Sequence, residues 1–140
     1  IKFHDFLNDI CISSKVPNKK VNFIVTNEIK SSGRPLQLKR CFNNLIENAI
    51  RYSKKIIVEL SSKEENIIVN ISDNGPGIPP SKYEDVFKPF FTLDASRNKL
   101  KGASGLGMSI ARDIVRSHGG DISLSKSNIG GLQVTVTLPI

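Results

Sequence analysis

The chain has 140 residues and a formal net charge of +7, with 39% hydrophobic and 24% charged residues. That length is enough for one domain with its own core, and the composition excludes a disordered chain. The basic residues are scattered, and there is no Trp and only two Tyr, so we expect no nucleic-acid binding. No apolar run approaches the roughly 18 residues that a membrane span needs.

The cysteines and the first residue bear on the cellular setting. Cys11 and Cys41 lie far apart in the sequence and make no disulfide framework, which favours a reducing compartment. The chain begins with Ile1 rather than Met and has no signal peptide. We therefore expect residues 1–140 to be a single domain of a longer protein whose remainder includes membrane segments.

The hydrophobic pattern predicts helices and strands in a mixed order. Apolar spacing predicts helices over 4–13, from Pro35 onward and over 106–117, with one helical turn near 82–87. Alternating or apolar runs predict strands over 21–26, 55–61, 66–72, 121–126 and 132–138. This order favours a two-layer α/β sandwich, in which about three helices cover one face of a mixed, mostly antiparallel sheet of about five strands. Residues 90–104 are polar and longer than an ordinary connection, which indicates a functional lid or disorder.

Asn44, Asn48 and Arg51 share one face of the helix that begins at Pro35, because each residue of an α-helix turns about 100°. The apolar residues of the same helix lie roughly opposite. An amide oxygen is a hard, neutral ligand suited to Mg²⁺ that phosphates already hold, and an arginine can bind a phosphate oxygen. This face could therefore hold a magnesium-bound nucleotide, although an ordinary solvated helix face would explain the same pattern.

Asp73 ends an apolar strand and is followed by a loop with two glycines, Gly75 and Gly77. A carboxylate at the end of a strand can accept a hydrogen bond from an exocyclic amine such as that of adenine. Glycine has no Cβ, so the backbone there can approach a ligand closely. A plain turn built on Asn-Gly and Pro-Gly is the competing interpretation.

A second glycine-rich segment, residues 102–108, leads into the last helix. Free N–H groups at a helix N-terminus make an anion site, whereas a flexible hinge would have the same composition. Two other phosphate motifs are excluded. Met108 occupies the position of the P-loop lysine, and Ile110 occupies that of the third glycine of GxGxxG.

Aromatic residues and histidines give weaker signals. Phe87, Phe90 and Phe91 either anchor one end of a lid or form a small core cluster, and both interpretations can hold. We expect His4 at the surface. His118, in His-Gly-Gly, is expected at a helix C-terminus, where a partial positive charge suits the dipole. Neither histidine has metal-ligand partners at useful spacing.

Taken together and in this order, these segments resemble the catalytic ATP-binding domain of bacterial sensor histidine kinases. That domain belongs to a superfamily shared with gyrase, heat-shock-90 and mismatch-repair ATPases, and the similarity extends over essentially the whole chain. The matching motifs are an N box, a first glycine box, an F box, and second and third glycine boxes, at residues 44–52, 73–77, 87–91, 105–107 and 130–131. The Asn-Ala-Ile-Arg-Tyr, Lys-Pro-Phe and Gly-Gly-Leu runs are most similar to osmolarity-sensor kinases of the EnvZ type.

The resemblance implies a role for each matching residue. Asn48 would bind Mg²⁺ with Asn44 as its helper near the phosphates, and Asp73 would hold the adenine amine. Arg51 would lie beside phosphate, completing a catalytic set with the two asparagines, and Tyr52 would lie near the ribose. The rest of the implied pocket is Gly75, Gly77, Ile78, Phe87, Leu106 and Met108. A lid with Ser104, Gly105 and Gly107 would close over the triphosphate, aided by Arg97, Lys99 or Lys101.

The chain departs from the family pattern at four positions, one of which is Ser104, where threonine is common. Ala103 replaces the usual first glycine of the second glycine box, where a positive φ would cost an alanine about 1 kcal/mol. Leu132 stands where a threonine often contributes to the adenine site, and Val134 stands where phenylalanine is common. A weaker or partly degenerate nucleotide site is therefore left open.

The resemblance implies that ATP·Mg²⁺ is bound and that its γ-phosphoryl group passes to a histidine on a separate dimerisation domain. A response regulator receiver domain would then accept the phosphoryl group. The chain would be a monomeric cytoplasmic domain of a protein that is a homodimer in the bacterial inner membrane.

Two other hypotheses remain open. An ATPase of the gyrase or heat-shock-90 type uses a glutamate where this chain has Asn44, and Glu47 is turned about 100° from Asn48. The second is a non-enzymatic interaction module that keeps the fold with a silent pocket, which the departures at Ala103 and Leu132 would allow.

Overall fold

The computed structural model describes residues 2–14, 18–26, 28–31, 33–91 and 106–140. Its elements in chain order are α1 (Phe3–Ser13), β1 (Lys20–Val25), α2 (Pro35–Tyr52), β2 (Lys55–Lys63), β3 (Asn66–Asp73), the 3₁₀ turns η1 (Pro80–Lys82) and η2 (Asp85–Phe87), α4 (Gly107–Ser117), β4 (Asp121–Lys126) and β5 (Leu132–Pro139). The α-helices and strands agree with the sequence-based expectations to within one or two residues at their ends. The helical turn expected near 82–87 is instead two separate 3₁₀ turns, the first of which begins at a proline whose fixed φ suits that position.

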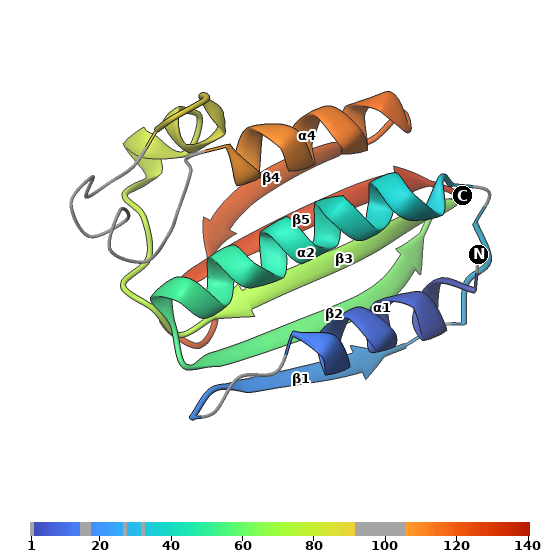
Figure 1. Cartoon of the computed structure of the whole chain (residues 1–140), viewed down its shortest axis with the longest axis horizontal. Helices are drawn as coiled ribbons and strands as arrows, with labels where there is room; N and C mark the ends of the chain where they lie inside the picture. Colours follow the sequence, from blue (N-terminus) through green and yellow to red (C-terminus); the bar gives the residue numbers. More distant parts are fainter. Residues whose placement is uncertain (1, 15–17, 27, 32, 92–105) are drawn as a thin grey trace.

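The strands of the described residues form one mixed sheet in the order β1-β2-β3-β5-β4. β1 runs parallel to β2, and the other three neighbouring pairs are antiparallel. Figure 1 shows α1, α2 and α4 on the same face of this sheet. The predicted two-layer sandwich with a mostly antiparallel sheet is therefore confirmed. Residues 92–104 of the lid expected over 90–104 lie outside the described residues.

The hydrophobic core lies between the sheet and its helices. Every second residue of β3 is buried, as the period of a strand with one covered face requires. The whole apolar stripe predicted on α2 is buried, together with Cys41. The rings of Phe3 and Phe42 meet edge to face at 5.8 Å, which packs α1 against α2.

The other face of the sheet carries polar side chains that pair across strands. Thr135 Oγ1 donates to Asn70 Oδ1 at 2.7 Å, and Ser72 Oγ donates to Gln133 Oε1 at 3.1 Å. None of the helices in the described part of the chain is long and apolar enough to cross a membrane.

The end of α4 is tied to the start of α2. Gly119 has φ +84°, the left-handed conformation that ends many helices. His118 Nε2 accepts a hydrogen bond from Arg34 N at 3.1 Å, while its Nδ1 lies 2.8 Å from Ile114 O. His118 thus stands at the C-terminal end of α4, as the sequence predicted, and its ring links that end to the start of α2. His4, which we expected at the surface, is 20% exposed, and its Nε2 lies 3.6 Å from Asp5 Oδ1.

Candidate functional site

One end of the sheet gathers predicted site residues from distant parts of the sequence. At the left of Figure 1, α2 ends at Tyr52, β3 ends at Asp73 and α4 begins at Gly107. α2 and α4 lie side by side, and two contacts give their relative direction. Cys41 Sγ lies 3.6 Å from Ala111 O, and Asn44 Nδ2 lies 3.5 Å from Gly107 O, so the two helices are antiparallel.

Asp73 is buried, with 7% of its surface exposed. Its Oδ1 accepts hydrogen bonds from Gly75 N at 2.9 Å and from Leu132 N at 3.1 Å. Burial raises the pKa of the carboxyl above its usual range, and the two backbone hydrogen bonds offset only part of that effect. The other oxygen, Oδ2, has no hydrogen-bond partner among the described residues, yet it is not fully buried. One oxygen is therefore fixed by the backbone, and the other can accept from a ligand.

Three glycines lie near Asp73 at positions where a side chain would clash or where the backbone conformation favours glycine. A Cβ on Gly131 would lie 2.0 Å from Asp73 Oδ1, and Gly131 N donates to Asp73 O at 3.0 Å. A Cβ on Gly75 would lie 2.7 Å from Tyr52 O. Gly77 has φ +73°, a backbone conformation that favours glycine. Gly131 of the third glycine box, which the sequence identified only by resemblance, thus packs directly against Asp73, the carboxylate expected to bind adenine.

Asn48 is half-buried and follows Asn44 by one helical turn on the same side of α2. Because Asn44 already contacts the first residue of α4, Asn48 lies about 6 Å further along α2, past the N-terminus of α4. Its side-chain amide has no hydrogen-bond partner among the described residues. In α4, Ile110 N bonds to Leu106 O at 3.0 Å, so the N–H groups of 107–109 precede this bond and are left for other acceptors. An unpaired amide and a helix N-terminus therefore lie close together.

Arg51 lies in an open hollow of about 350 Å³ that is lined by Lys19, Glu47, Ile50 and Arg51. Lys19 Nζ donates to Ile50 O at the end of α2. The hollow brings a second cation, Lys19, beside Arg51. The pairing of Lys19 with Lys20, and of Lys54 with Lys55, is visible in the sequence, but only the fold brings Lys19 to α2.

The apolar site residues belong partly to the core. Phe87 is buried, whereas Phe90 is 73% exposed, so the aromatic cluster divides between the core and the surface. Ile78 and Met108 are half-buried and pack against the core. The guanidinium of Arg112 lies 4.2 Å from the centre of the Phe87 ring, a contact that no sequence motif predicted.

Several predicted residues lie outside the described residues. They are Arg97, Lys99, Lys101, Ala103, Ser104 and Gly105. Their implied roles in a lid over the triphosphate stay predictions, as does the effect of Ala103 on the second glycine box.

The chain matches a family model described as histidine kinase-, DNA gyrase B- and HSP90-like ATPase over residues 33–140. It therefore belongs to this family of ATPases. It is similar to the sensor histidine kinase GtrS of Pseudomonas aeruginosa, with 39% identity over 107 residues that make up 76% of this chain and 22% of GtrS. The chain thus spans about a fifth of the length of that relative.

Solved structures show the same fold. The histidine kinase domain of the E. coli osmosensor EnvZ matches with a TM-score of 0.75 and 27% identity, over 100% of this chain and 87% of that one. The ATP binding domain of PrrB from Mycobacterium tuberculosis matches with a TM-score of 0.83 and 23% identity, over 99% and 94% of the two chains. The relationship to sensor histidine kinases that the motifs indicated is confirmed.

Proposed function

We propose that this chain binds ATP with Mg²⁺ and donates the γ-phosphoryl group to a histidine on a separate domain in two-component signalling. The observation that carries the proposal is the state of Asp73. It is a desolvated carboxylate with one oxygen fixed by two backbone N–H groups and the other free to accept. Such an acceptor suits the exocyclic amine of adenine.

The glycines around Asp73 support the same assignment. Gly75 and Gly131 let the backbone pack directly against Asp73, where a Cβ on either residue would clash with neighbouring atoms, and this packing holds the carboxylate in place. Leu132 places its N–H, rather than a threonine hydroxyl, on Asp73 Oδ1. The departure at Leu132 therefore keeps the backbone contact that orients the carboxylate.

The residues near the start of α4 fit the phosphates and the metal. The unpaired amide of Asn48 offers a neutral oxygen to a cation, and the free N–H groups at the N-terminus of α4 favour an anion. Arg51 and Lys19 border the neighbouring hollow and add positive charge. Bound Mg²⁺ would supply charge neutralisation of the phosphates, which together with positioning is most of what phosphoryl transfer requires.

Asn44 favours a kinase over a water-activating ATPase. Its amide cannot take a proton from water, and its Nδ2 already lies against Gly107 O. Glu47 is exposed and lines the hollow with Lys19 and Arg51. Asn44 thus offers no general base for hydrolysis, and Glu47 is turned about 100° from Asn48.

The remaining proposals concern the whole protein. The phosphoacceptor histidine would lie on a dimerisation domain outside this chain, and a response regulator receiver domain would accept the phosphoryl group from it. The isolated chain would be a monomer on the cytoplasmic side, and the full-length protein a homodimer in the bacterial inner membrane.

A phosphotransfer assay tests the proposal. The chain is incubated with γ-labelled ATP and Mg²⁺, alone and with the phosphoacceptor domain of its own full-length protein. Label should appear on the acceptor histidine only, with no label on this chain and no steady release of phosphate by the chain alone. Steady phosphate release without an acceptor would favour the ATPase alternative instead.

A further inference from the structure

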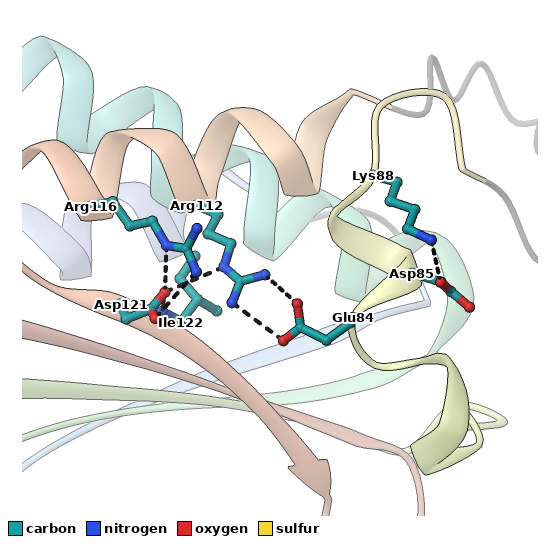
Figure 2. A network of polar contacts seen from close by, with 7 residues as sticks. All are labelled: Glu84, Asp85, Lys88, Arg112, Arg116, Asp121 and Ile122. Atoms are coloured by element: carbon teal, nitrogen blue, oxygen red, sulfur yellow. Dashed lines mark hydrogen bonds and ion pairs between the residues drawn. The ribbon is translucent and has the colours of Figure 1, made fainter.

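Arg112 of α4 connects the segment around η2 with the start of β4, and Figure 2 shows its contacts with Glu84 and Asp121. Its Nη1 and Nη2 donate to the Glu84 carboxylate at 3.0 and 3.4 Å, and its Nε donates to Asp121 Oδ1 at 3.3 Å. The guanidinium also covers the Phe87 ring at 4.2 Å from its centre. One side chain therefore contacts the start of η2, the F-box ring and the first residue of β4.

The burial of these groups indicates what the network does. The Arg112 side chain is 13% exposed, whereas Glu84 is 80% exposed and Asp121 is 56% exposed. Ion pairs to exposed carboxylates add little stability because water screens them. A covered, planar guanidinium that holds a carboxylate through two bonds and lies over a ring still fixes relative orientation. The network is thus better suited to setting geometry than to adding stability.

The charges of the network persist at neutral pH. Hydrogen bonding from Arg112 holds the pKa of Glu84 below its usual range. Burial alone would raise the pKa of Asp121, but hydrogen bonds from Arg116, the Ile122 N–H and Arg112 outweigh it, and that pKa is lowered as well. Within the described part of the chain, the Arg116 side chain pairs with Asp121 alone, at 3.2 Å. Among the described residues, Arg116 therefore shares Asp121 with Arg112 but has no ion pair with Glu84, and it can serve as a control for Arg112.

The network lies where two parts of the candidate site meet. η2 with Phe87 precedes residues 92–105, and α4 follows them. The first residue of α4, Gly107, contacts Asn44. A shift of η2 against α4 would therefore move Phe87 relative to the N-terminus of α4 and to the asparagines of α2.

We infer that Arg112 is a positioning residue, which holds η2 and Phe87 against α4 and thereby sets the geometry of the phosphate end of the nucleotide site. The inference rests on the function proposed above. A merely structural arginine would affect only the free energy of unfolding, and its loss would leave the nucleotide affinity of the folded chain unchanged.

Three substitutions separate the contacts of the network. Glu84→Gln removes the charge and one of the two hydrogen bonds of the tie to η2, and Arg112→Met removes every contact of Arg112. Arg116→Met removes a cation from Asp121 and leaves the tie to η2 intact. In calorimetric titrations with ATP and Mg²⁺, the first two variants should show a Kd weaker by about threefold or more, and Arg116→Met an unchanged Kd. The double variant of Glu84→Gln with Arg112→Met should bind no more weakly than Arg112→Met alone, because the contact that Glu84→Gln weakens is already absent in Arg112→Met. Arg112→Lys should recover part of the affinity, since it keeps the charge.

Hydrogen exchange without nucleotide gives an independent readout. The amides of Phe87 and Lys88, which bond to Glu84 O and Asp85 O within η2, should exchange faster in Glu84→Gln and Arg112→Met but not in Arg116→Met. An unchanged Kd, unchanged exchange, or equal weakening by Arg116→Met would each overturn the inference and leave the proposed function standing. A folded wild-type chain that binds no ATP would overturn both.

Discussion

Asp73 is a buried carboxylate whose charge the fold does not neutralise. No ion pair in the described residues reaches it, and its partners are two backbone N–H groups on a single oxygen. A protein without a ligand gains nothing from a desolvated, half-satisfied acid. Asp73 thus lowers the stability of the chain without a ligand, and its second carboxylate oxygen can accept a hydrogen bond from a ligand.

Asp73→Asn should separate stability from binding. The amide oxygen can still accept from Gly75 N and Leu132 N, so the fold should persist. The new NH₂ group would face the adenine amine, donor against donor, and weaken ATP binding by roughly tenfold to a hundredfold. Calorimetry measures the affinity, and circular dichroism controls for folding. Normal ATP affinity in a folded Asp73→Asn variant would contradict the assignment of Asp73.

The same residue predicts a pH dependence of stability. The pKa of Asp73 is raised in the folded state, so the native chain holds this proton at a pH where the unfolded chain has lost it. The contribution of Asp73 to stability therefore falls as pH rises from below about 3.9 through the folded-state pKa. Urea unfolding across this range should show that the unfolding free energy of Asp73→Asn increases relative to that of the wild type as pH rises. A difference that is constant with pH would contradict it.

Asn48→Ala tests the metal assignment. The residue lies on the exposed side of α2 and has no partner in the described residues, so its loss should leave the unfolding free energy nearly unchanged. The Mg²⁺-dependent part of ATP affinity should fall by at least about tenfold. Asn43→Ala makes the same chemical change on the same helix, turned by about 140° from Asn48, and should bind normally. If Asn48→Ala binds ATP·Mg²⁺ as the wild type does, the assignment is wrong.

Residue types at local spacing were enough to propose part of the candidate site, whose ligand contacts stay a prediction. The two asparagines one turn apart and an acid at the end of a strand each point to a ligand. Arg112 and Lys19 were missed because their roles depend on partners far along the chain. Glu84 lies 28 residues from Arg112, and Ile50 lies 31 residues from Lys19. No periodic pattern indicates such pairs.

Among the elements, the turn between β4 and β5 is the one that positions Asp73. Gly131→Ala would drive a Cβ to 2.0 Å from Asp73 Oδ1. We expect it to lower the unfolding free energy by about 1–3 kcal/mol and to weaken ATP binding. Gly130→Ala is the matched control, since that residue has φ +108° but open space around it. It should lower stability through backbone strain and leave affinity unchanged, and equal loss of affinity in both variants would contradict the contact.

Helices and strands with a clear hydrophobic period could be predicted from the sequence, whereas the short 3₁₀ turns could not. α2 has 18 residues with an unbroken apolar stripe, and each strand has a clear alternation or apolar run. η1 and η2 have three residues each, too few to carry a period, and the sequence pattern predicts a single helical turn in their place. The antiparallel contact of α2 with α4, which brings Asn48 past the N-terminus of α4, is a tertiary feature that no single segment predicts.

At the scale of the whole molecule, the reactivity of the Cys41 thiol tests the packing of α2 on α4. Burial raises the pKa of its thiol to about 12, so at pH 8 roughly one thiol in ten thousand would be ionised. Iodoacetamide should label Cys41 slowly in the native chain and rapidly in urea, as mass spectrometry of the modified peptide can follow. Because the folded-state pKa is raised, stability should also decline above about pH 9 as the unfolded thiol ionises. Rapid native labelling at Cys41 would contradict this packing.

The central claim is that the end of the sheet near Asp73 and Asn48 binds ATP through Mg²⁺. Calorimetric titration of the wild-type chain with ATP, once with Mg²⁺ and once with EDTA, tests it most directly. We predict one site per chain, with much stronger binding when Mg²⁺ is present. A folded chain that binds no ATP at millimolar concentration, or binds equally with EDTA, would contradict the account.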